Sequence, residues 1–180
     1  RSTDVFYVSH PKSGRTWLAY MLAIVLREKF SPREPTLANL KQFLPLLRAR
    51  DSAIKNFESY PDPRILRTEG PQFPELYPRT VYIIRDPRAG LVSYFHHHLH
   101  DDPDSSWTIE SFIDEILTFG CIRSTEPHLV RWDRQVLAWL DRAKRQPVKI
   151  VQYEKMKDDR RKVLEEVVEE HRHAVADEAC

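Results

Sequence analysis

The sequence predicts an α/β protein in which a parallel β-sheet carries helices on both faces. Short runs of β-branched and aromatic residues alternate along the chain with longer segments of helical periodicity, and this order favours parallel strands joined by helices. The length of 180 residues fits one domain, so we expect residues 1–180 to form a single unit. A hydrophobic content of 41% is enough for a buried core between the layers.

Four short segments have the composition of strands, being rich in Val, Ile, Tyr and Phe. They are Val5–Ser9, Ile65–Thr68, residues 80–85 and residues 148–153. We expect the second and third of these segments to be interior strands of the sheet.

Five longer segments have helical patterns: residues 16–30, 87–99, 107–119, 127–144 and 160–171. The first contains the longest apolar run, from Leu18 to Leu26, which is about half the roughly 20 residues that a membrane span needs. We therefore expect a buried helix and no transmembrane segment. Residues 31–63 are rich in proline and predict irregular structure with one or two short helices.

Charge is almost balanced, with 28 Lys and Arg against 27 Asp and Glu. This balance excludes a histone-like basic protein and an acidic disordered tail, and it predicts no nucleic-acid partner, so any anion site must be local. Cys121 and Cys180 are the only cysteines, which argues against a disulfide framework. With no secretory signal pattern at Arg1, the expected location is the cytoplasm.

The most informative segment is the loop that follows the first strand. A tight turn before a helix presents backbone N–H groups to an anion, and Gly14 permits a close approach. Two cations and two hydroxyl groups surround this point, supplied by Lys12, Ser13, Arg15 and Thr16. The loop lacks the Gly and Lys order of the Walker A motif, which argues against a small-molecule kinase.

Three motifs give a family resemblance. HPKSGRTWL resembles the PKSGTTWL loop of sulfotransferases that use 3′-phosphoadenosine 5′-phosphosulfate (PAPS). YIIRDPRAGLVSYFHH resembles that family's 3′-phosphate motif, in which an Arg ends a strand and a Ser follows eight residues later, here Arg85 and Ser93. YEKMKDD, which begins at Tyr153, resembles the YEDMK segment after the last core strand. The motifs occur in the family's order and span residues 5 to about 170.

The resemblance implies a P-loop NTPase-like three-layer sandwich and a defined reaction. A sulfuryl group would pass from PAPS to the hydroxyl or amine of a small-molecule, carbohydrate or lipid acceptor, releasing 3′-phosphoadenosine 5′-phosphate (PAP) without a metal. Lys12 would stabilise the leaving oxygen, and Arg85 with Ser93 would hold the 3′-phosphate, while Tyr153 borders the adenine. The 5′ end would contact the loop and helix start, which comprise Lys12, Ser13, Gly14, Arg15, Thr16 and Trp17.

The resemblance also places the general base. Relatives carry a His in a KTHLP segment at the end of a strand, and the matching residues here begin with Arg67, Thr68 and Glu69. Glu69 occupies the His position, and a carboxylate can serve as the base. In the alternative, Glu69 is an exposed turn residue and the protein is a non-catalytic nucleotide-binding module of the same fold.

Further departures leave questions open. Arg15 replaces the usual Thr of the loop and either strengthens sulfate binding or points to solvent, and the family's RKGxxGxW lid segment is missing from the sequence. His96 and His100 share a helix face near Asp101, but no spacing sets a complete ligand shell, so we expect no metal and a polar helix end that lines the acceptor cleft. The sequence leaves a homodimer open and does not identify the acceptor.

Overall fold

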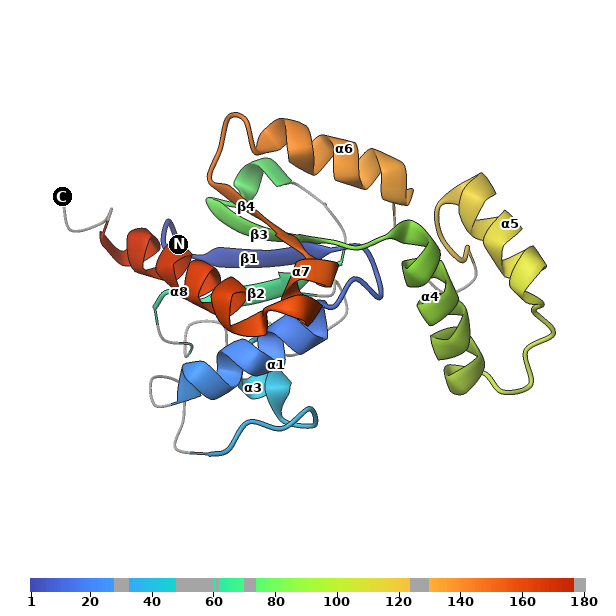
Figure 1. The fold of residues 1–180 in the computed structure, drawn as a ribbon, viewed down its shortest axis with the longest axis horizontal. Coiled ribbons are helices and arrows are strands. Elements are labelled where there is room, and N and C mark those ends of the chain that lie inside the picture. Colours follow the sequence, from blue (N-terminus) through green and yellow to red (C-terminus); the bar gives the residue numbers. More distant parts are fainter. Residues whose placement is uncertain (28–32, 48–59, 61, 70–73, 124–129, 177–180) are drawn as a thin grey trace.

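A four-stranded parallel sheet forms the centre of the computed structural model (Figure 1), which describes residues 1–27, 33–47, 60, 62–69, 74–123 and 130–176. The strands are β1 (Val5–Ser9), β2 (Ile65–Thr68), β3 (Arg79–Ile84) and β4 (Val148–Gln152). Their order in the sheet is β2-β1-β3-β4, and every neighbouring pair is parallel. The register sets Val5 of β1 beside Ile65 of β2 on one side and Arg79 of β3 on the other.

Helices connect the strands and cover both faces of the sheet (Figure 1). In chain order the helical elements are α1 (Arg15–Val25), α3 (Leu40–Phe43), the 3-10 helix η2 (Pro74–Leu76), α4 (Pro87–Asp101), α5 (Ile109–Phe119), α6 (Trp132–Arg142), α7 (Tyr153–Asp158) and α8 (Arg160–Ala176). This arrangement confirms the predicted α/β class with a parallel sheet between two helical layers. None of the helices in the described part of the chain combines the length and apolar content needed to cross a bilayer.

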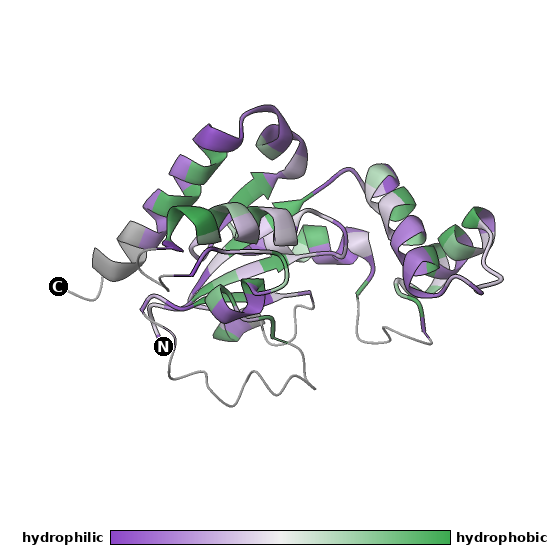
Figure 2. Ribbon diagram, turned by 90° about the horizontal axis from the view of Figure 1, so that it is seen from below, coloured by the Kyte–Doolittle hydropathy of each residue, from purple (hydrophilic) through white to green (hydrophobic). Residues whose placement is uncertain are grey.

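The side chains of β1 point alternately to the two faces of the sheet and so contribute to two separate hydrophobic clusters. Val5 and Tyr7 pack with α1, α3 and α8, whereas Phe6 and Val8 pack with α6, where Trp139 is almost fully buried. Successive side chains of a strand point to opposite faces, so one strand anchors both helical layers. Figure 2 shows the outcome, with apolar residues concentrated in the strands and alternating with polar ones along the helices.

The helices α4 and α5 form a hairpin that extends beyond the carboxyl edge of the sheet (Figure 1). It has a small core of its own in which Tyr94 meets Phe112 edge to face, with ring centroids 5.3 Å apart, and Ile116 and Ile122 complete the cluster. Thr108 caps α5 through a reciprocal capping box with Ser111. The hairpin is therefore stabilised locally and independently of the two sheet clusters.

The position of β2 corrects one prediction, because β2 is an edge strand and not an interior one. Its four residues are nevertheless buried. Residues 45–47 cover the open edge: Arg67 donates its backbone N–H to the Pro45 carbonyl, and Leu47 donates to the Arg67 carbonyl. The predicted burial of this strand is therefore correct, but residues 45–47 cover its outer edge where an interior strand would have a second neighbouring strand.

Several element bounds also differ from the predictions. α1 ends at Val25, and residues 28–30 of the predicted helix lie outside the described residues, as do residues 127–129 at the start of the predicted helix over 127–144. α6 begins only at Trp132, because residues 130 and 131 are not helical. β4 stops at Gln152, so that Tyr153 opens α7, a helix that the sequence did not predict. Of residues 31–63, the described part holds the short helix α3.

A buried ion pair fixes the start of the sheet. Arg64 donates from Nε to Asp4 Oδ1 at 2.8 Å and from Nη2 to Oδ2 at 2.6 Å, and both side chains are at most 7% exposed. Burial alone raises the pKa of Asp4, but the hydrogen bonds from Arg64 and the N-terminus outweigh it and hold the pKa below its ordinary value. Asp4 is therefore a buried carboxylate whose charge depends chiefly on one guanidinium.

We expect Asp4→Asn to lower the free energy of unfolding by about 3 kcal/mol, since it leaves Arg64 buried without this anion. Urea denaturation followed by circular dichroism measures this change. Glu165→Gln is the control, because it breaks the exposed Arg161–Glu165 pair, whose loss costs only about 0.5 kcal/mol. Since the folded pKa of Asp4 is lowered, its contribution should be intact at neutral pH and disappear as the pH falls through that pKa. Equal costs for the two variants would contradict the assignment.

Candidate functional site

The carboxyl ends of the four strands carry the candidate functional side chains. His10 follows β1, Glu69 follows β2, Arg85 follows β3 and Tyr153 follows β4. Because the strands are parallel and adjacent, these ends meet at one edge of the sheet, the edge at which open α/β sheets bind ligands. The chain thus brings residues from four distant segments to one place.

The loop between β1 and α1 has the backbone of an anion-binding turn. Gly14 has a φ of 94° and Lys12 a φ of 60°, so two residues of the loop occupy the left-handed region. Ser13 donates its backbone N–H to the His10 carbonyl at 3.3 Å, which closes the turn, and α1 starts at Arg15. The first amides of an α-helix have no partner within the helix and carry the positive end of its dipole. The loop therefore directs donors toward the cleft described below.

Gly14 is required by close packing as well as by its dihedral angle. A Cβ atom at this position would lie 2.5 Å from Cδ2 of Tyr153. The Tyr153 ring also lies next to Trp17, with centroids 5.8 Å apart and planes inclined by 61°. Tyr153 and Trp17 thus form an aromatic wall beside the loop.

Arg85 links the loop to this aromatic wall. Its Nη1 donates to the Lys12 carbonyl at 2.7 Å, and its Cζ lies 4.2 Å from the centroid of the Tyr153 ring. Its Nε is buried and has no hydrogen-bond partner among the described residues. A buried donor without a partner is costly, so Arg85 retains capacity for an anion at this point.

A cleft of about 410 Å³ opens beside the loop. Every site residue predicted from the sequence lines it except Ser13: the set is Lys12, Gly14, Arg15, Thr16, Trp17, Glu69, Arg85, Ser93 and Tyr153. Ser13 is buried and lines a second, smaller cavity that adjoins the cleft.

The environment of Arg15 answers the question that its sequence left open. Arg15 is buried and does not point to solvent: its Nη1 donates to the Thr68 carbonyl at 2.6 Å and its Nη2 to Glu69 Oε1 at 2.5 Å. The Glu69 side chain is only 16% exposed, so it is not an exposed turn residue either. The two departures from the family pattern are therefore direct contacts of one another.

Glu69 is also held through its backbone. Its carbonyl accepts a hydrogen bond from Gln135 Nε2 at 3.0 Å, and Gln135 is a buried residue of α6. The carboxylate is fixed from one side by Arg15 and the main chain from the other by α6. This is the rigid support that a positioned acid–base group requires.

The cleft also contains residues outside the predicted site set, among them Arg67, which the sequence matched only to the KTHLP segment. Arg67 is buried beside Glu69 and its Nε donates to the Leu44 carbonyl at 2.8 Å, while Leu46 and His97 add an apolar and a polar part to the wall. His97 agrees with the expected polar helix end, and its position one helical turn after Ser93 was the available signal. No local sequence pattern could have predicted Leu46 as a cleft residue, because it reaches the cleft through a backbone bridge to Arg67, which is distant in the sequence.

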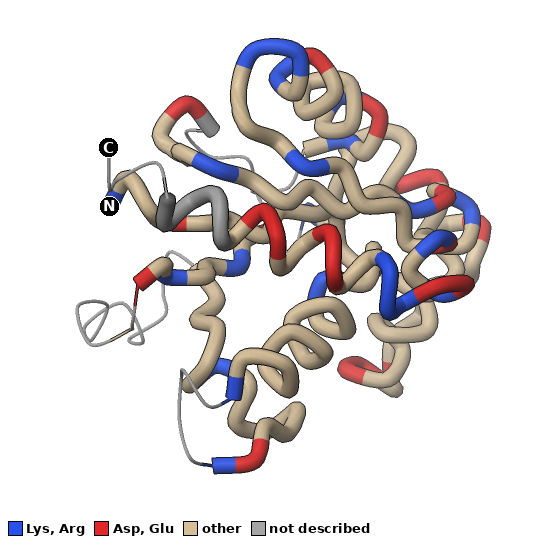
Figure 3. Tube along the Cα trace, turned by 60° about the vertical axis from the view of Figure 1, so that its left-hand side comes forward, with Lys and Arg blue, Asp and Glu red and all other residues tan. Residues whose placement is uncertain are grey.

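Neither the distribution of charged residues nor a group of metal ligands points to a second site in the described part of the chain. Lys and Arg are interspersed with Asp and Glu along the described chain (Figure 3). Within the described ranges, no group of three or more His, Cys, Asp or Glu side chains is arranged to hold a metal ion. His100 Nδ1 instead lies 3.1 Å from Asp101 Oδ1, at the exposed end of α4.

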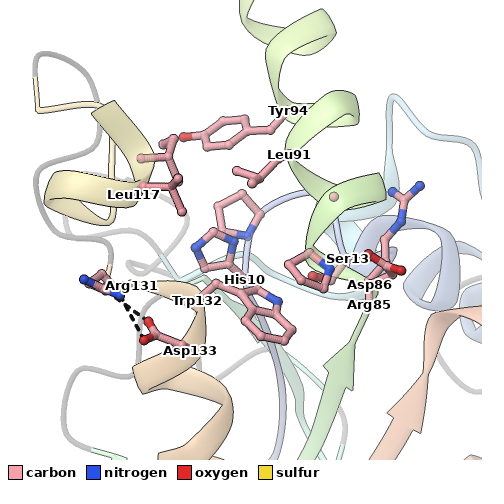
Figure 4. A pocket seen from close by; sticks show the side chains of 14 residues that line it. His10, Ser13, Arg85, Asp86, Leu91, Tyr94, Leu117, Arg131, Trp132 and Asp133 are labelled. Atoms are coloured by element: carbon pink, nitrogen blue, oxygen red, sulfur yellow. Dashed lines mark hydrogen bonds and ion pairs between the residues drawn. The ribbon is translucent and has the colours of Figure 1, made fainter. Parts of the chain in front are cut away.

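His10 is a buried, neutral histidine behind the loop. It is 5% exposed, and burial lowers its pKa from 6.5 to about 4, although hydrogen bonding to the backbone of Pro11 and Val130 and the charge of Glu69 act in the opposite direction. Sequence reasoning did not select His10, despite its place at the head of the HPKSG segment. Figure 4 shows its ring in the second cavity, near Leu91 and Trp132.

Comparison of the sequence with known protein families gives a match to one family. The family described as "Sulfotransferase domain" matches residues 2–169. Sulfotransferase 1E1 of Rattus norvegicus is 26% identical over 186 residues, covering 94% of this chain and 59% of that protein. The amine sulfotransferase of Oryctolagus cuniculus is 25% identical over 170 residues, covering 89% of this chain and 53% of that protein. The chain thus spans a little over half the length of these relatives.

Solved structures show the same fold. The mouse sulfotransferase SULT7A1 complexed with PAP has a TM-score of 0.64 at 23% identity, with 95% of this chain and 59% of that chain covered. Retinol dehydratase in complex with androsterone and inactive cofactor PAP has a TM-score of 0.60 at 18% identity, with 94% of this chain and 60% of that chain covered. At these identities the likeness concerns the fold.

We expect Gly14→Ala to lower the free energy of unfolding by at least about 1 kcal/mol, because a side chain at positive φ is strained and its Cβ would overlap Tyr153. Gly90→Ala is the matched control: a Cβ at Gly90 would meet no atom within 4 Å, and an Ala in helix α4 should stabilise by roughly 0.5 to 1 kcal/mol. Urea denaturation of both variants measures the difference. An unchanged stability of Gly14→Ala would show that the loop does not need this conformation.

The buried His10 predicts a pH dependence. Because its folded pKa of about 4 lies below the ordinary 6.5, the unfolded chain binds the extra proton first, and stability should fall as the pH drops from 6.5 to 4. The His10 share of this loss is about 3 kcal/mol. His10→Phe removes the titration, so the difference in unfolding free energy between wild type and variant should change by that amount between pH 7 and pH 4. Parallel pH curves would mean that His10 titrates normally.

Proposed function

Because the chain belongs to the sulfotransferase family, we propose that it transfers a sulfuryl group from PAPS to a hydroxyl or amine group of a small-molecule acceptor. The observation that carries this proposal is the joint lining of one cleft by two anion-binding elements, the loop at Lys12 and Gly14 and the strand end at Arg85. A donor with phosphate groups at both ends of its ribose needs two such elements. The family match and the names of the relatives support the same reaction class.

The residues present fit the donor nucleotide. Backbone donors and Lys12 at the start of α1 suit its 5′ end, while the unpartnered Nε of Arg85 and the hydroxyl of Ser93 suit the 3′-phosphate. Trp17 and Tyr153 offer aromatic surface for the adenine. Arg15 does not fit the role of a direct sulfate ligand, since its guanidinium contacts Glu69 and the Thr68 carbonyl.

When bound, PAPS supplies an activated sulfuryl group whose leaving group is a phosphate oxygen. In the proposed transfer, the acceptor oxygen or nitrogen forms a bond to sulfur as the bond from sulfur to that phosphate oxygen breaks. Glu69 takes the proton of the acceptor, and Lys12 stabilises the negative charge that develops on the leaving oxygen. The chain's own task is to hold these two groups on opposite sides of the reacting centre.

Arg15 influences how Glu69 can act. The guanidinium donates to the carboxylate, so it holds the side chain in place but occupies part of one carboxylate oxygen. A carboxylate accepts several hydrogen bonds, and Arg15 contacts Oε1, so this ion pair does not exhaust its acceptor capacity. The pair also favours the second candidate function, a nucleotide-binding module without turnover, in which Glu69 serves only to neutralise Arg15.

Lys12→Ala and Glu69→Gln should each lower the transfer rate by about 10²-fold to 10⁴-fold, the range of a lost charge stabiliser or general base. Transfer of labelled sulfate from PAPS to a panel of phenols, alcohols and amines measures the rate. Glu110→Gln is the control, because Glu110 is an exposed residue of α5 that lines neither cavity.

Isothermal titration separates the two candidate functions. PAP should bind to wild type and to Glu69→Gln with similar affinity and more tightly than ADP in the absence of Mg²⁺. Binding of PAP with no turnover of any acceptor would support the non-catalytic module, and full activity of Glu69→Gln would remove Glu69 as the base. Preference for ADP would contradict the donor assignment.

A further inference from the structure

A second cavity of about 240 Å³ lies next to the loop and adjoins the cleft. Its walls come from the loop, the end of β3, the helices α4 and α5 and the start of α6 (Figure 4). Neither Lys12 nor Glu69 lines it, whereas Pro11, Arg85 and Tyr94 belong to both cavities. A molecule bound here would adjoin the cleft without occupying the place of the transfer reaction.

The wall of this second cavity is largely apolar. It is built mainly from Pro11, Pro87, Leu91, Ile116, Leu117 and Trp132. An apolar concave surface that stays open in a folded protein favours a ligand with an apolar body.

Two buried polar atoms interrupt this wall. His10 Nε2 and Tyr94 Oη have no hydrogen-bond partner among the described residues, although both side chains are only 5% exposed. Figure 4 shows His10 on the loop side of the cavity and Tyr94 reaching across toward Leu117. Buried polar groups gain from a hydrogen-bond partner, so these two atoms are the points of the wall at which the hydroxyl group of a ligand would be favoured.

The charges around the cavity compensate one another. Two cations and two anions line it: Arg131 forms an ion pair with Asp133, with Nη2 3.0 Å from Oδ2, while Arg85 and Asp86 belong to the opposite wall, where Asp86 pairs with the exposed Arg88. His10 itself is neutral at physiological pH, because burial lowers its pKa to about 4. The cavity therefore offers no net charge to an ion and favours a neutral ligand.

The volume limits the size of that ligand. An apolar cavity of about 150 Å³ is enough to hold benzene, so about 240 Å³ accommodates a ring with one or two small substituents. A nucleotide or a steroid is too large for it. Size, charge and the two unpartnered atoms together define one chemical class.

We propose that this second cavity binds a small neutral hydroxylated ring compound, a phenol or a cyclic alcohol, whose hydroxyl group bonds to His10 Nε2 and Tyr94 Oη. This is a ligand site additional to the cleft, and it does not depend on the transfer reaction proposed above. Because the ligand contacts the back of the loop and Arg85, it would bind beside the nucleotide and act as an effector and not as the acceptor.

Gly90 provides a specific way to block the cavity. It lines the cavity from α4, and a Cβ at Gly90 would meet no atom within 4 Å, so a Leu can extend into the space without displacing the backbone. Ala89→Leu is the matched control, since Ala89 is the exposed neighbour on the same helix and lines neither cavity. Both variants place the same side chain on the same helix.

Fluorine NMR of 4-fluorophenol with the full chain tests the proposal. Saturable binding should occur with wild type and Ala89→Leu, and Gly90→Leu should weaken it at least about tenfold. 4-Fluorotoluene, which lacks the hydroxyl, should bind wild type about tenfold more weakly, and His10→Phe should remove most of this preference. Saturating PAP should leave the binding of 4-fluorophenol in place.

Three results would overturn the proposal. One is no saturable binding of 4-fluorophenol by wild type. Another is equal binding by Gly90→Leu and Ala89→Leu, which would place the phenol in the acceptor part of the cleft, since Gly90 lines only the second cavity. The third is displacement by PAP, which would place the phenol where the nucleotide binds. The Gly90 comparison uses no nucleotide and no turnover, so it stands or fails separately from the proposed transfer reaction.

Discussion

The parallel direction of the four strands is the constraint on which the candidate site depends. Each strand runs the same way, so His10, Glu69, Arg85 and Tyr153, which follow four different strands, gather at one edge of the sheet. An antiparallel neighbour would send its strand end, and the residue that follows it, to the opposite edge of the sheet. The two helical layers serve this arrangement, because residues on opposite faces of β1 fix the sheet between them.

At this edge, tight packing around Gly14 couples the loop to the end of the sheet. Tyr153 lies against Gly14, Arg85 lies over the Tyr153 ring, and the Arg85 guanidinium donates to the Lys12 carbonyl. Glu154 adds a further link, since its Oε1 accepts the backbone N–H of Asp86. The loop, the end of β3 and the start of α7 therefore form one connected unit, and the shape of the cleft follows from contacts among residues that also line it.

Local patterns in the sequence predicted most of the strands and helices and the anion-binding loop, whereas Glu69, Ser93 and Tyr153 were assigned from the resemblance to the sulfotransferase motifs. The four strands, the loop and the residues at strand ends carry signals within short windows, such as β-branched runs or a Gly beside cations. What the sequence did not predict depends on distant contacts. The edge position of β2 follows from its cover by residues 45–47, and the pairing of Arg15 with Glu69 joins positions 54 apart. The burial of His10 depends on α4 and α6 together, and no local pattern encodes it.

The separate core of the α4–α5 hairpin has a consequence for how such proteins diversify. Tyr94, Phe112 and Ile116 stabilise the hairpin without contributing to the two clusters that hold the sheet. Substitutions on α5 and on the face of α4 that borders the second cavity can thus accumulate with little penalty to the sheet or to the loop. Selectivity for new compounds can evolve, or be engineered by exchange of hairpin residues other than Ser93, while the nucleotide-facing edge stays unchanged.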